Sequence, residues 1–244
     1  MLRRPLPNLL FATLVLVLPL LGQQARAGEL LAQTSTVPAH SSQTQPLARM
    51  LSTLAPEADR RVLRLAARAV SCAGRDADQL AIIDYSLPST QPRLWVFDLV
   101  NRTLTFKELV AHGRGSGNAQ AMAFSNVPDS WQSSLGLFRT LNSYQGSNGY
   151  SLRLEGLEPG VNDKAFERAI VIHGADYADE EFIAKTGRLG RSHGCPAVRE
   201  DIASPLIDSI KDGQYLFVYY PDADWLNSSR FLHCDSPAPQ LASQ

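Results

Sequence analysis

Several features that would indicate other classes of protein are scarce or missing in this sequence. The 244 residues contain three cysteines and neither the Cys-x-x-Cys nor the His-Glu-x-x-His spacing that common zinc sites use. The longest apolar run, residues 9–21, is too short to cross a membrane comfortably. Lysine and arginine are not gathered into a basic patch, so nothing in the sequence indicates a nucleic-acid partner.

The first 27 residues have the pattern of a signal peptide. Arg3 and Arg4 precede the apolar run, and Ala25-Arg26-Ala27 is an A-x-A cleavage site. We expect cleavage after Ala27, a periplasmic or secreted location, and no stable membrane insertion of the mature chain. Loss of these three arginines takes the formal net charge from −1 to about −4.

The mature chain divides into a leader, a helical appendage and a longer β-rich domain. Residues 28–45 are rich in Ser, Thr, Gln and Ala without periodicity, which predicts a flexible leader. Apolar residues at helical spacing over residues 46–73 predict two helices, the second starting at Pro56. The main domain is expected over residues 78–234, and residues 235–244 form a polar tail that we expect to be disordered.

From Leu80 onward the periodicity is that of strands. Short apolar runs separated by Gly, Pro, Asn, Asp and Ser predict a mainly β, α+β domain with a sandwich-like or barrel-like arrangement. The pair Asn101-Arg102 is short enough for a hairpin turn. Apolar spacing over residues 202–210, a segment that includes Pro205, predicts a helix. The predicted strands are Leu80–Tyr85, Arg93–Val100, Leu104–Ala111, Leu135–Leu141, Ser151–Leu157, Ala169–His173 and Tyr215–Tyr220.

Two short stretches carry the residues most suited to chemistry. A buried strand is predicted to end at His173-Gly174, and Ser-His-Gly-Cys follows at residues 192–195. A thiol needs a nearby base to become a nucleophile at neutral pH, and glycines let backbone N–H groups approach a reacting carbonyl. This combination predicts Cys195 as a nucleophile with a histidine base, although a small buried cysteine and a structural histidine remain the plain alternatives.

The same stretches resemble the active-site signature of the L,D-transpeptidase (YkuD-type) family, in its murein L,D-transpeptidase branch. That signature is a histidine at a strand end, a spacer, and then Ser/Thr-His-Gly-Cys. The resemblance extends over about residues 81–220 and implies an L,D-transpeptidase-like β-sandwich domain with a helix after the cysteine. Further matching segments are residues 110–113, 134–136, 190–192 and 195–198.

The resemblance implies an exported cysteine acyltransferase that acts on peptidoglycan stem peptides without a cofactor. Cys195 would attack the carbonyl before the terminal D-residue of a stem tetrapeptide, and His173 would accept the thiol proton. The carbonyl of Gly174 would orient the imidazole, the N–H groups of Gly194 and Cys195 would bind the oxyanion, and His193 would shape the pocket. A second stem amine would resolve the thioester in a transpeptidase, and water would do so in an L,D-carboxypeptidase.

Substrate-binding residues are expected around this signature. Besides Ser192, His112 could line the cleft and Ser134 could form part of its wall, although a solvated loop and a strand start explain these two equally well. Arg191 and Arg199 could each bind a stem-peptide carboxylate through two hydrogen bonds. An ordinary surface ion pair is the alternative for both arginines.

Two functions of other classes remain open. His173, His193 and Cys195 could be three ligands of a zinc ion with one open position, as in a metal-dependent hydrolase. The chain could also be a wall-binding module whose cysteine has ordinary reactivity.

The nucleophile assignment carries two expectations about the cysteines. We expect the pKa of Cys195 to be lowered by its surroundings, with help from a helix that begins soon after it. In an oxidising compartment, Cys72 and Cys234 should form a disulfide because the nucleophile must stay free. The protein is expected to be a monomer.

Overall fold

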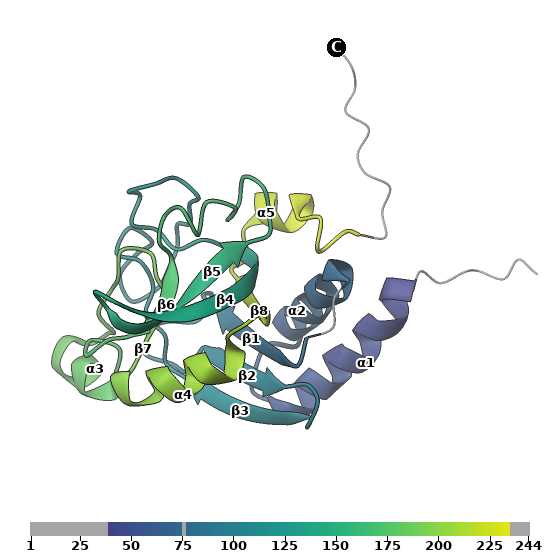
Figure 1. Ribbon diagram of the computed structural model, residues 1–244, viewed down its shortest axis with the longest axis horizontal. Coiled ribbons are helices and arrows are strands. Elements are labelled where there is room, and N and C mark those ends of the chain that lie inside the picture. Colours follow the sequence, from purple (N-terminus) through teal and green to yellow (C-terminus); the bar gives the residue numbers. More distant parts are fainter. Residues whose placement is uncertain (1–38, 75–76, 235–244) are drawn as a thin grey trace, which may run out of the picture. The chain divides into compact units, whose positions relative to one another are not determined.

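One mixed sheet of eight strands organises the described part of the chain, in the order β3-β2-β1-β8-β4-β5-β6-β7 (Figure 1). The computed structural model describes residues 39–74 and 77–234, so the predicted signal peptide, most of the predicted leader and the tail from residue 235 lie outside the described residues. Strands β1 and β8 run parallel, as do β6 and β7. The strands are β1 (Gln79–Asp84), β2 (Leu94–Asp98), β3 (Thr103–Glu108), β4 (Gly136–Gly146), β5 (Gly149–Gly156), β6 (Val171–Gly174), β7 (Ala197–Val198) and β8 (Tyr215–Tyr219).

Helices accompany the sheet, and this mixture confirms the predicted α+β class. Within the two described ranges, none of them is both long enough and apolar enough to span a bilayer. The helices are α1 (Ala39–Leu54), α2 (Arg60–Ala73), α3 (Glu180–Thr186), α4 (Glu200–Ile210) and α5 (Ala223–Ser228).

The centre of the sheet is buried on both faces. Every residue of β8 is buried, and so is every residue of β1 after Gln79. Successive strand residues point to opposite faces, so this uniform burial means that both faces are covered. Helices α2 and α4 both pack against β1. The near-continuous apolar runs of β1 and β8 are typical of such fully buried parallel strands.

All seven predicted strands are confirmed, with boundaries shifted by a few residues. The hairpin predicted at Asn101-Arg102 joins β2 to β3, and Arg102 adopts a φ of 54° there. Strand β4 runs further than predicted, to Gly146, and forms a long hairpin with β5. The sequence reasoning missed α3, α5 and the two-residue strand β7, because such short elements leave almost no periodic pattern.

The two helices predicted over residues 46–73 are present, but they start at different residues from those predicted. Helix α1 includes residues 39–45, which were expected to be flexible leader, and Pro46 lies inside it. Helix α2 begins after Pro56 because Asp59 caps it, accepting a hydrogen bond from the N–H of Arg61. The two helices lie side by side (Figure 1), and α2 packs against β1 and β8.

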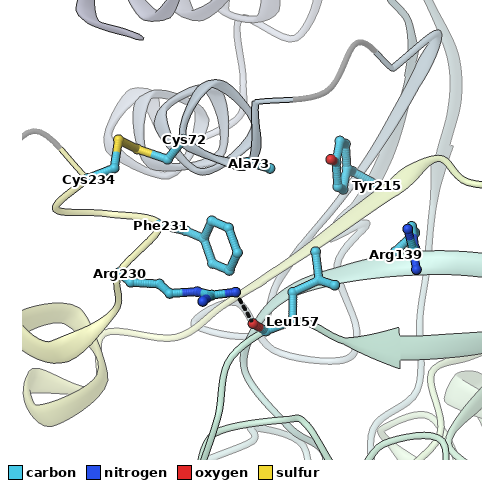
Figure 2. Close-up of a pocket in the computed structure, with 8 residues that line it drawn as sticks. All are labelled: Cys72, Ala73, Arg139, Leu157, Tyr215, Arg230, Phe231 and Cys234. Carbon is cyan, nitrogen blue, oxygen red and sulfur yellow. Dashed lines mark hydrogen bonds between the residues drawn. A yellow bond between two sulfur atoms is a disulfide. The ribbon is translucent and has the colours of Figure 1, made fainter. Parts of the chain in front are cut away.

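The predicted disulfide between Cys72 and Cys234 is present. It joins the end of α2 to the segment that follows α5, with the two Cα atoms 5.7 Å apart. Figure 2 shows this disulfide at one side of a cavity of about 490 Å³ and Arg139 at the other. The side chain of Arg230, which also lines the cavity, donates to the carbonyl of Leu157 at 3.2 Å. The disulfide therefore fixes the segment after α5 to the end of α2. Neither His173 nor any residue of the 192–195 signature lines this cavity.

The spacer between the two parts of the signature is packed rather than loose. It contains α3, whose start is capped by Asp179 through a 2.7 Å hydrogen bond from the N–H of Phe182. Gly190 lies against Tyr177, where an added Cβ would come within 2.4 Å of the tyrosine Cβ. A second small apolar core lies under the spacer and is formed by Leu109, Ala111, Ala175, Ala178, Leu189 and Ala197.

Candidate active site

The Cys195 side chain lies against the backbone at the start of β6. Its Sγ is 3.5 Å from the N–H of Val171 and 3.6 Å from the carbonyl oxygen of Ala169. Further along, β6 pairs with the segment after Cys195, since His173 N–H donates to the carbonyl of Pro196 at 3.4 Å. In a regular strand pairing, the N–H of Val171 would donate to a backbone carbonyl of the neighbouring segment. Here the Cys195 thiol takes the place of that carbonyl.

The expectation of a lowered thiol pKa is wrong. Burial raises the pKa of Cys195, although the N–H of Val171 and the Arg168 guanidinium both oppose that rise. Helix α4 begins only at Glu200, five residues after the cysteine, so its N-terminus does not lie at the thiol. In the free protein Cys195 is therefore a neutral thiol at pH 7.

The imidazole of His173 is held by a hydrogen bond to the backbone. Its Nδ1 lies 2.8 Å from the carbonyl oxygen of Gly174, and a carbonyl can only accept, so Nδ1 carries the proton. In a neutral ring this leaves the lone pair on Nε2. Burial lowers the pKa of His173, and the hydrogen bond to Gly174 only partly offsets this. The contact expected between the imidazole and the Gly174 carbonyl is thus present.

Ser192 fixes the turn that leads to Cys195. Its hydroxyl donates to the carbonyl of Cys195 at 2.6 Å and accepts the N–H of Gly194 at 3.0 Å. The Gly194 amide, predicted as an oxyanion donor, is therefore already bonded to Ser192 in this arrangement. Among the described residues, nothing accepts a hydrogen bond from the N–H of Cys195, which leaves that amide as a donor.

The glycine-rich strip after β3 runs beside the signature. Its backbone pairs with residues 192–197: Ala111 forms a bridge with Ala197, and Gly113 forms one with Ser192. An added Cβ on Gly113 would lie 2.7 Å from the Cα of Gly194, so only glycine fits. The match of residues 110–113 to the family signature thus has a physical reason, which is close approach of two backbones.

His112 lies within this strip but faces the protein interior. It is fully buried, and its Nδ1 accepts a hydrogen bond from Arg93 at 2.8 Å. Burial and the Arg93 charge lower the pKa of His112 to about 3, so the ring is neutral. Arg93 also donates to the carbonyls of Val110 and Leu87. His112 is therefore not the solvated loop residue that the sequence left open, and its backbone carbonyl accepts the N–H of Ser192.

Two residues near the nucleophile were missed by the sequence reasoning. The hydroxyl of Ser133 accepts the N–H of Gly113 and donates to the carbonyl of Gly194, each at 3.0 Å. The Arg168 guanidinium donates to residues 125–134, reaching the carbonyls of Ser125 and Gln132 at 2.6 Å each. Neither Ser133 nor Arg168 belongs to a recognisable motif, because their contacts depend on how distant segments of the chain come together.

The other predicted binding residues are engaged within the protein. Ser134 donates to the carbonyl of Ser125 in its own loop and accepts from Arg168, which lies between β5 and β6. Arg199 contacts the two carboxylates Glu108 and Asp201, which is the ion pair that the sequence left as an alternative.

Arg191 and His193 lie at the surface of the site. Arg191 donates to the carbonyl of Gly117 at 2.8 Å and to the side chain of Asn118. His193 is exposed, and its ring centroid lies 5.7 Å from that of Trp131. The guanidinium carbon of Arg114 lies 3.7 Å from the centroid of the same Trp131 ring. Across residues 39–74 and 77–234, no group of three or more His, Cys, Asp or Glu side chains is arranged to hold a metal ion. His173 is buried, whereas His193 is exposed.

Three solved structures to which this chain is similar share little sequence identity with it. An L,D-transpeptidase from Mycobacterium smegmatis is 15% identical, with 59% of each chain covered and a TM-score of 0.36. An L,D-transpeptidase (Yku) from Stackebrandtia nassauensis is 11% identical, covering 73% of this chain and 78% of that one, with a TM-score of 0.36. The helical cell shape determining protein Pgp2 (K307A mutant) from Campylobacter jejuni is 12% identical, covering 59% and 47%, with a TM-score of 0.39.

These likenesses carry no functional argument at such low identity. The chain covers 59% of the length of the Mycobacterium smegmatis structure. No curated protein matches the sequence. The model of the L,D-transpeptidase catalytic domain, however, matches residues 54–219, which include the whole signature and all eight strands of the sheet. The chain therefore belongs to the L,D-transpeptidase catalytic domain family.

Proposed function

We propose that this protein is an exported peptidoglycan L,D-transpeptidase that works through a thioester on Cys195. The observation that carries the proposal is the imidazole of His173, whose Nδ1–H is fixed on the Gly174 carbonyl at 2.8 Å. That contact leaves Nε2 as a proton acceptor on the strand that also holds the Cys195 thiol through Val171.

The proposed reaction has two halves. Cys195 attacks the carbonyl that precedes the terminal D-residue of a stem tetrapeptide, while His173 takes the thiol proton. The proton then passes to the nitrogen of the leaving D-residue, and the C–N bond breaks to give the thioester. An amine of a second stem peptide attacks the thioester, loses a proton to His173 and restores the thiol.

The oxyanion of both tetrahedral intermediates would bind at the N–H of Cys195. That amide has no acceptor among the described residues, whereas the Gly194 amide is bonded to Ser192. A rigid donor beside the nucleophile stabilises the developing charge without reorganisation. We assign to Ser192 the role of holding this peptide in place, and to exposed His193 a contact with bound substrate at the cleft mouth.

Export is part of the proposal. The signal-like N-terminus lies outside the described residues, and the Cys72–Cys234 disulfide is of the kind that persists in oxidising compartments. Expression of the full chain with a C-terminal tag, followed by N-terminal sequencing of exported protein, tests it. A mature N-terminus at residue 28 is the expected result, and a cytoplasmic full-length protein would contradict it.

Transfer, rather than hydrolysis, is the outcome we favour. Incubation of the mature protein with tetrapeptide-stem muropeptides should give cross-linked dimers by mass spectrometry, and none with Cys195→Ala. A carbapenem should add covalently to the wild type and leave Cys195→Ala unmodified. Tripeptide stems as the sole product, even with abundant amine acceptor, would make the protein an L,D-carboxypeptidase instead.

A further inference from the structure

A small cavity adjoins the backbone that holds the nucleophile. It has a volume of about 200 Å³ and is lined partly by Ala169, Ile170 and Val171. The first and last of these contact the Cys195 thiol, and Ile170 approaches Gly194, where an added Cβ would lie 2.9 Å from its Cδ1. The space corresponds to about seven water molecules at ~30 Å³ each, which suits the end of a peptide.

Arg153 and Tyr144 also line this cavity. The guanidinium of Arg153 stacks on the Tyr144 ring with its carbon 3.8 Å from the centroid. The ring itself has a fixed place, since it lies over Gly146, where an added Cβ would be 2.6 Å from the tyrosine Cε2. A planar cation stacked on a held ring is oriented before any ligand arrives.

The strand register directs Arg153 to the same face as the proposed base. In the antiparallel pairing of β5 with β6, Ser151 lies opposite His173 and Arg153 lies opposite Val171. Tyr144 of β4 lies opposite Ser151. Direct partners share a face and residues two apart share it as well, so Tyr144, Arg153 and His173 all face one side of the sheet.

Arg153 has no hydrogen-bond acceptor within residues 39–74 and 77–234. Among the described residues, no carboxylate, carbonyl or hydroxyl oxygen accepts a hydrogen bond from its guanidinium, and it belongs to no ion pair. Arg168, Arg191 and Arg199, by contrast, all donate to protein oxygens. Arg153 therefore presents a planar set of donors toward the cavity beside Cys195, the geometry that matches a carboxylate.

We propose that Arg153 binds a carboxylate of the donor stem peptide in this cavity, next to the scissile bond. This inference rests on the proposed function, since it assigns a substrate group to the same site. Two carboxylates of a stem tetrapeptide are near the scissile amide. One is the C-terminal carboxylate of the leaving D-residue, and the other is the side-chain carboxylate of a diamino diacid at the preceding position.

The test uses the mature protein and three synthetic tetrapeptides: the parent, its C-terminal carboxamide, and its side-chain carboxamide. Release of the terminal D-residue gives kcat/KM for the wild type, Arg153→Met and Arg153→Lys. We expect the wild type to lose about 10- to 100-fold on one carboxamide, the range for a lost charge-assisted hydrogen bond. The carboxamide that loses activity identifies which carboxylate is bound.

Arg153→Met should lose a similar factor on the parent peptide and should no longer distinguish it from that carboxamide. Arg153→Lys should fall between, because an ammonium keeps the charge without the planar fork. Arg139→Met is the matched control: this arginine lies on β4, pairs with Glu155 and lines the other cavity (Figure 2). Alkylation of Cys195 by iodoacetamide, an uncharged reagent, should be the same in all of these proteins.

Each other outcome overturns a defined part of the reasoning. If the wild type releases the D-residue equally fast from all three peptides, the protein is an enzyme of the proposed kind but Arg153 does not bind a carboxylate. If Arg153→Met slows alkylation and turnover in parallel, the side chain only supports the fold. If the wild type releases nothing from any of the peptides, the proposed function fails and the carboxylate site fails with it.

Discussion

Replacement of Ser133 by alanine tests whether one buried hydroxyl holds the signature in shape. Its oxygen accepts the N–H of Gly113 and donates to the carbonyl of Gly194, each at 3.0 Å, and the residue is 2% exposed. Alanine removes this oxygen alone, so both backbone groups lose their partner. The space left is about the size of one oxygen atom, and the two glycine backbones beside it are in contact, so a water molecule cannot take its place.

The cost follows from two unsatisfied backbone groups. Each costs about 1–3 kcal/mol when buried, so the free energy of unfolding should fall by about 3 kcal/mol for Ser133→Ala. At about 2–4 °C per kcal/mol for a chain of this size, Tm should drop by about 6–12 °C. Urea unfolding followed by tryptophan fluorescence measures the first quantity, and calorimetry measures the second. Carbapenem acylation of Cys195 should slow by at least about tenfold, because the Gly194 peptide that precedes the nucleophile is no longer fixed.

The matched control is Ser147→Ala, at the exposed tip of the β4–β5 hairpin. A surface substitution of this kind should change the free energy of unfolding by no more than about 0.5 kcal/mol and leave acylation unchanged. If Ser133→Ala and Ser147→Ala have the same free energy of unfolding and the same acylation rate, the Ser133 hydroxyl does not hold the Gly113 and Gly194 segments together. The account of the site's rigidity would then be wrong.

Three further predictions concern the thiol, the histidines and the disulfide. Burial raises the pKa of Cys195 and lowers that of His173, so both side chains are neutral at pH 7. The rate of Cys195 alkylation by iodoacetamide should therefore rise about tenfold per pH unit between pH 6 and 8. A pH-independent rate would reveal a preformed thiolate–imidazolium pair. His173→Ala should slow carbapenem acylation by about 100-fold and His193→Ala by less, as followed by intact-mass spectrometry, and the reverse order would exchange their roles. Cys72→Ser should lower the free energy of unfolding by up to about 5 kcal/mol in urea, since the disulfide spans 162 residues, and an unchanged midpoint would show that the bond adds no stability.

The sequence predicted those parts of the fold that have a repeating pattern or a chemical necessity. The alternating and apolar runs located all seven longer strands, and the need for a free nucleophile paired Cys72 with Cys234. Helix starts were less predictable, because a single side chain decides them: Asp59 caps α2 several residues beyond Pro56. Pro46, in turn, did not prevent α1 from continuing through it.

Within the site, contacts between neighbours in the chain were easier to predict than contacts that depend on the fold. The pairing of His173 with the Gly174 carbonyl follows from adjacency in the chain, and it is present. The bond from the Gly194 amide to Ser192 depends on how a four-residue turn closes, and no spacing rule shows that. Arg153 was not singled out at all, because its relation to Cys195 exists only through the register of two neighbouring strands.

The direction of both pKa shifts has a consequence for the proposed reaction. A thiol whose pKa is raised by burial is less often ionised, but its thiolate is a stronger nucleophile once formed, because nucleophilicity rises with basicity. An imidazole whose pKa is lowered by burial is a weak base toward that thiol, but its protonated form is a strong acid. The step that needs a strong acid is expulsion of the D-residue, since an amide nitrogen leaves only when protonated. The burial that opposes an ion pair in the free protein therefore favours collapse of the tetrahedral intermediate toward the thioester, and activation of Cys195 is expected only with substrate bound.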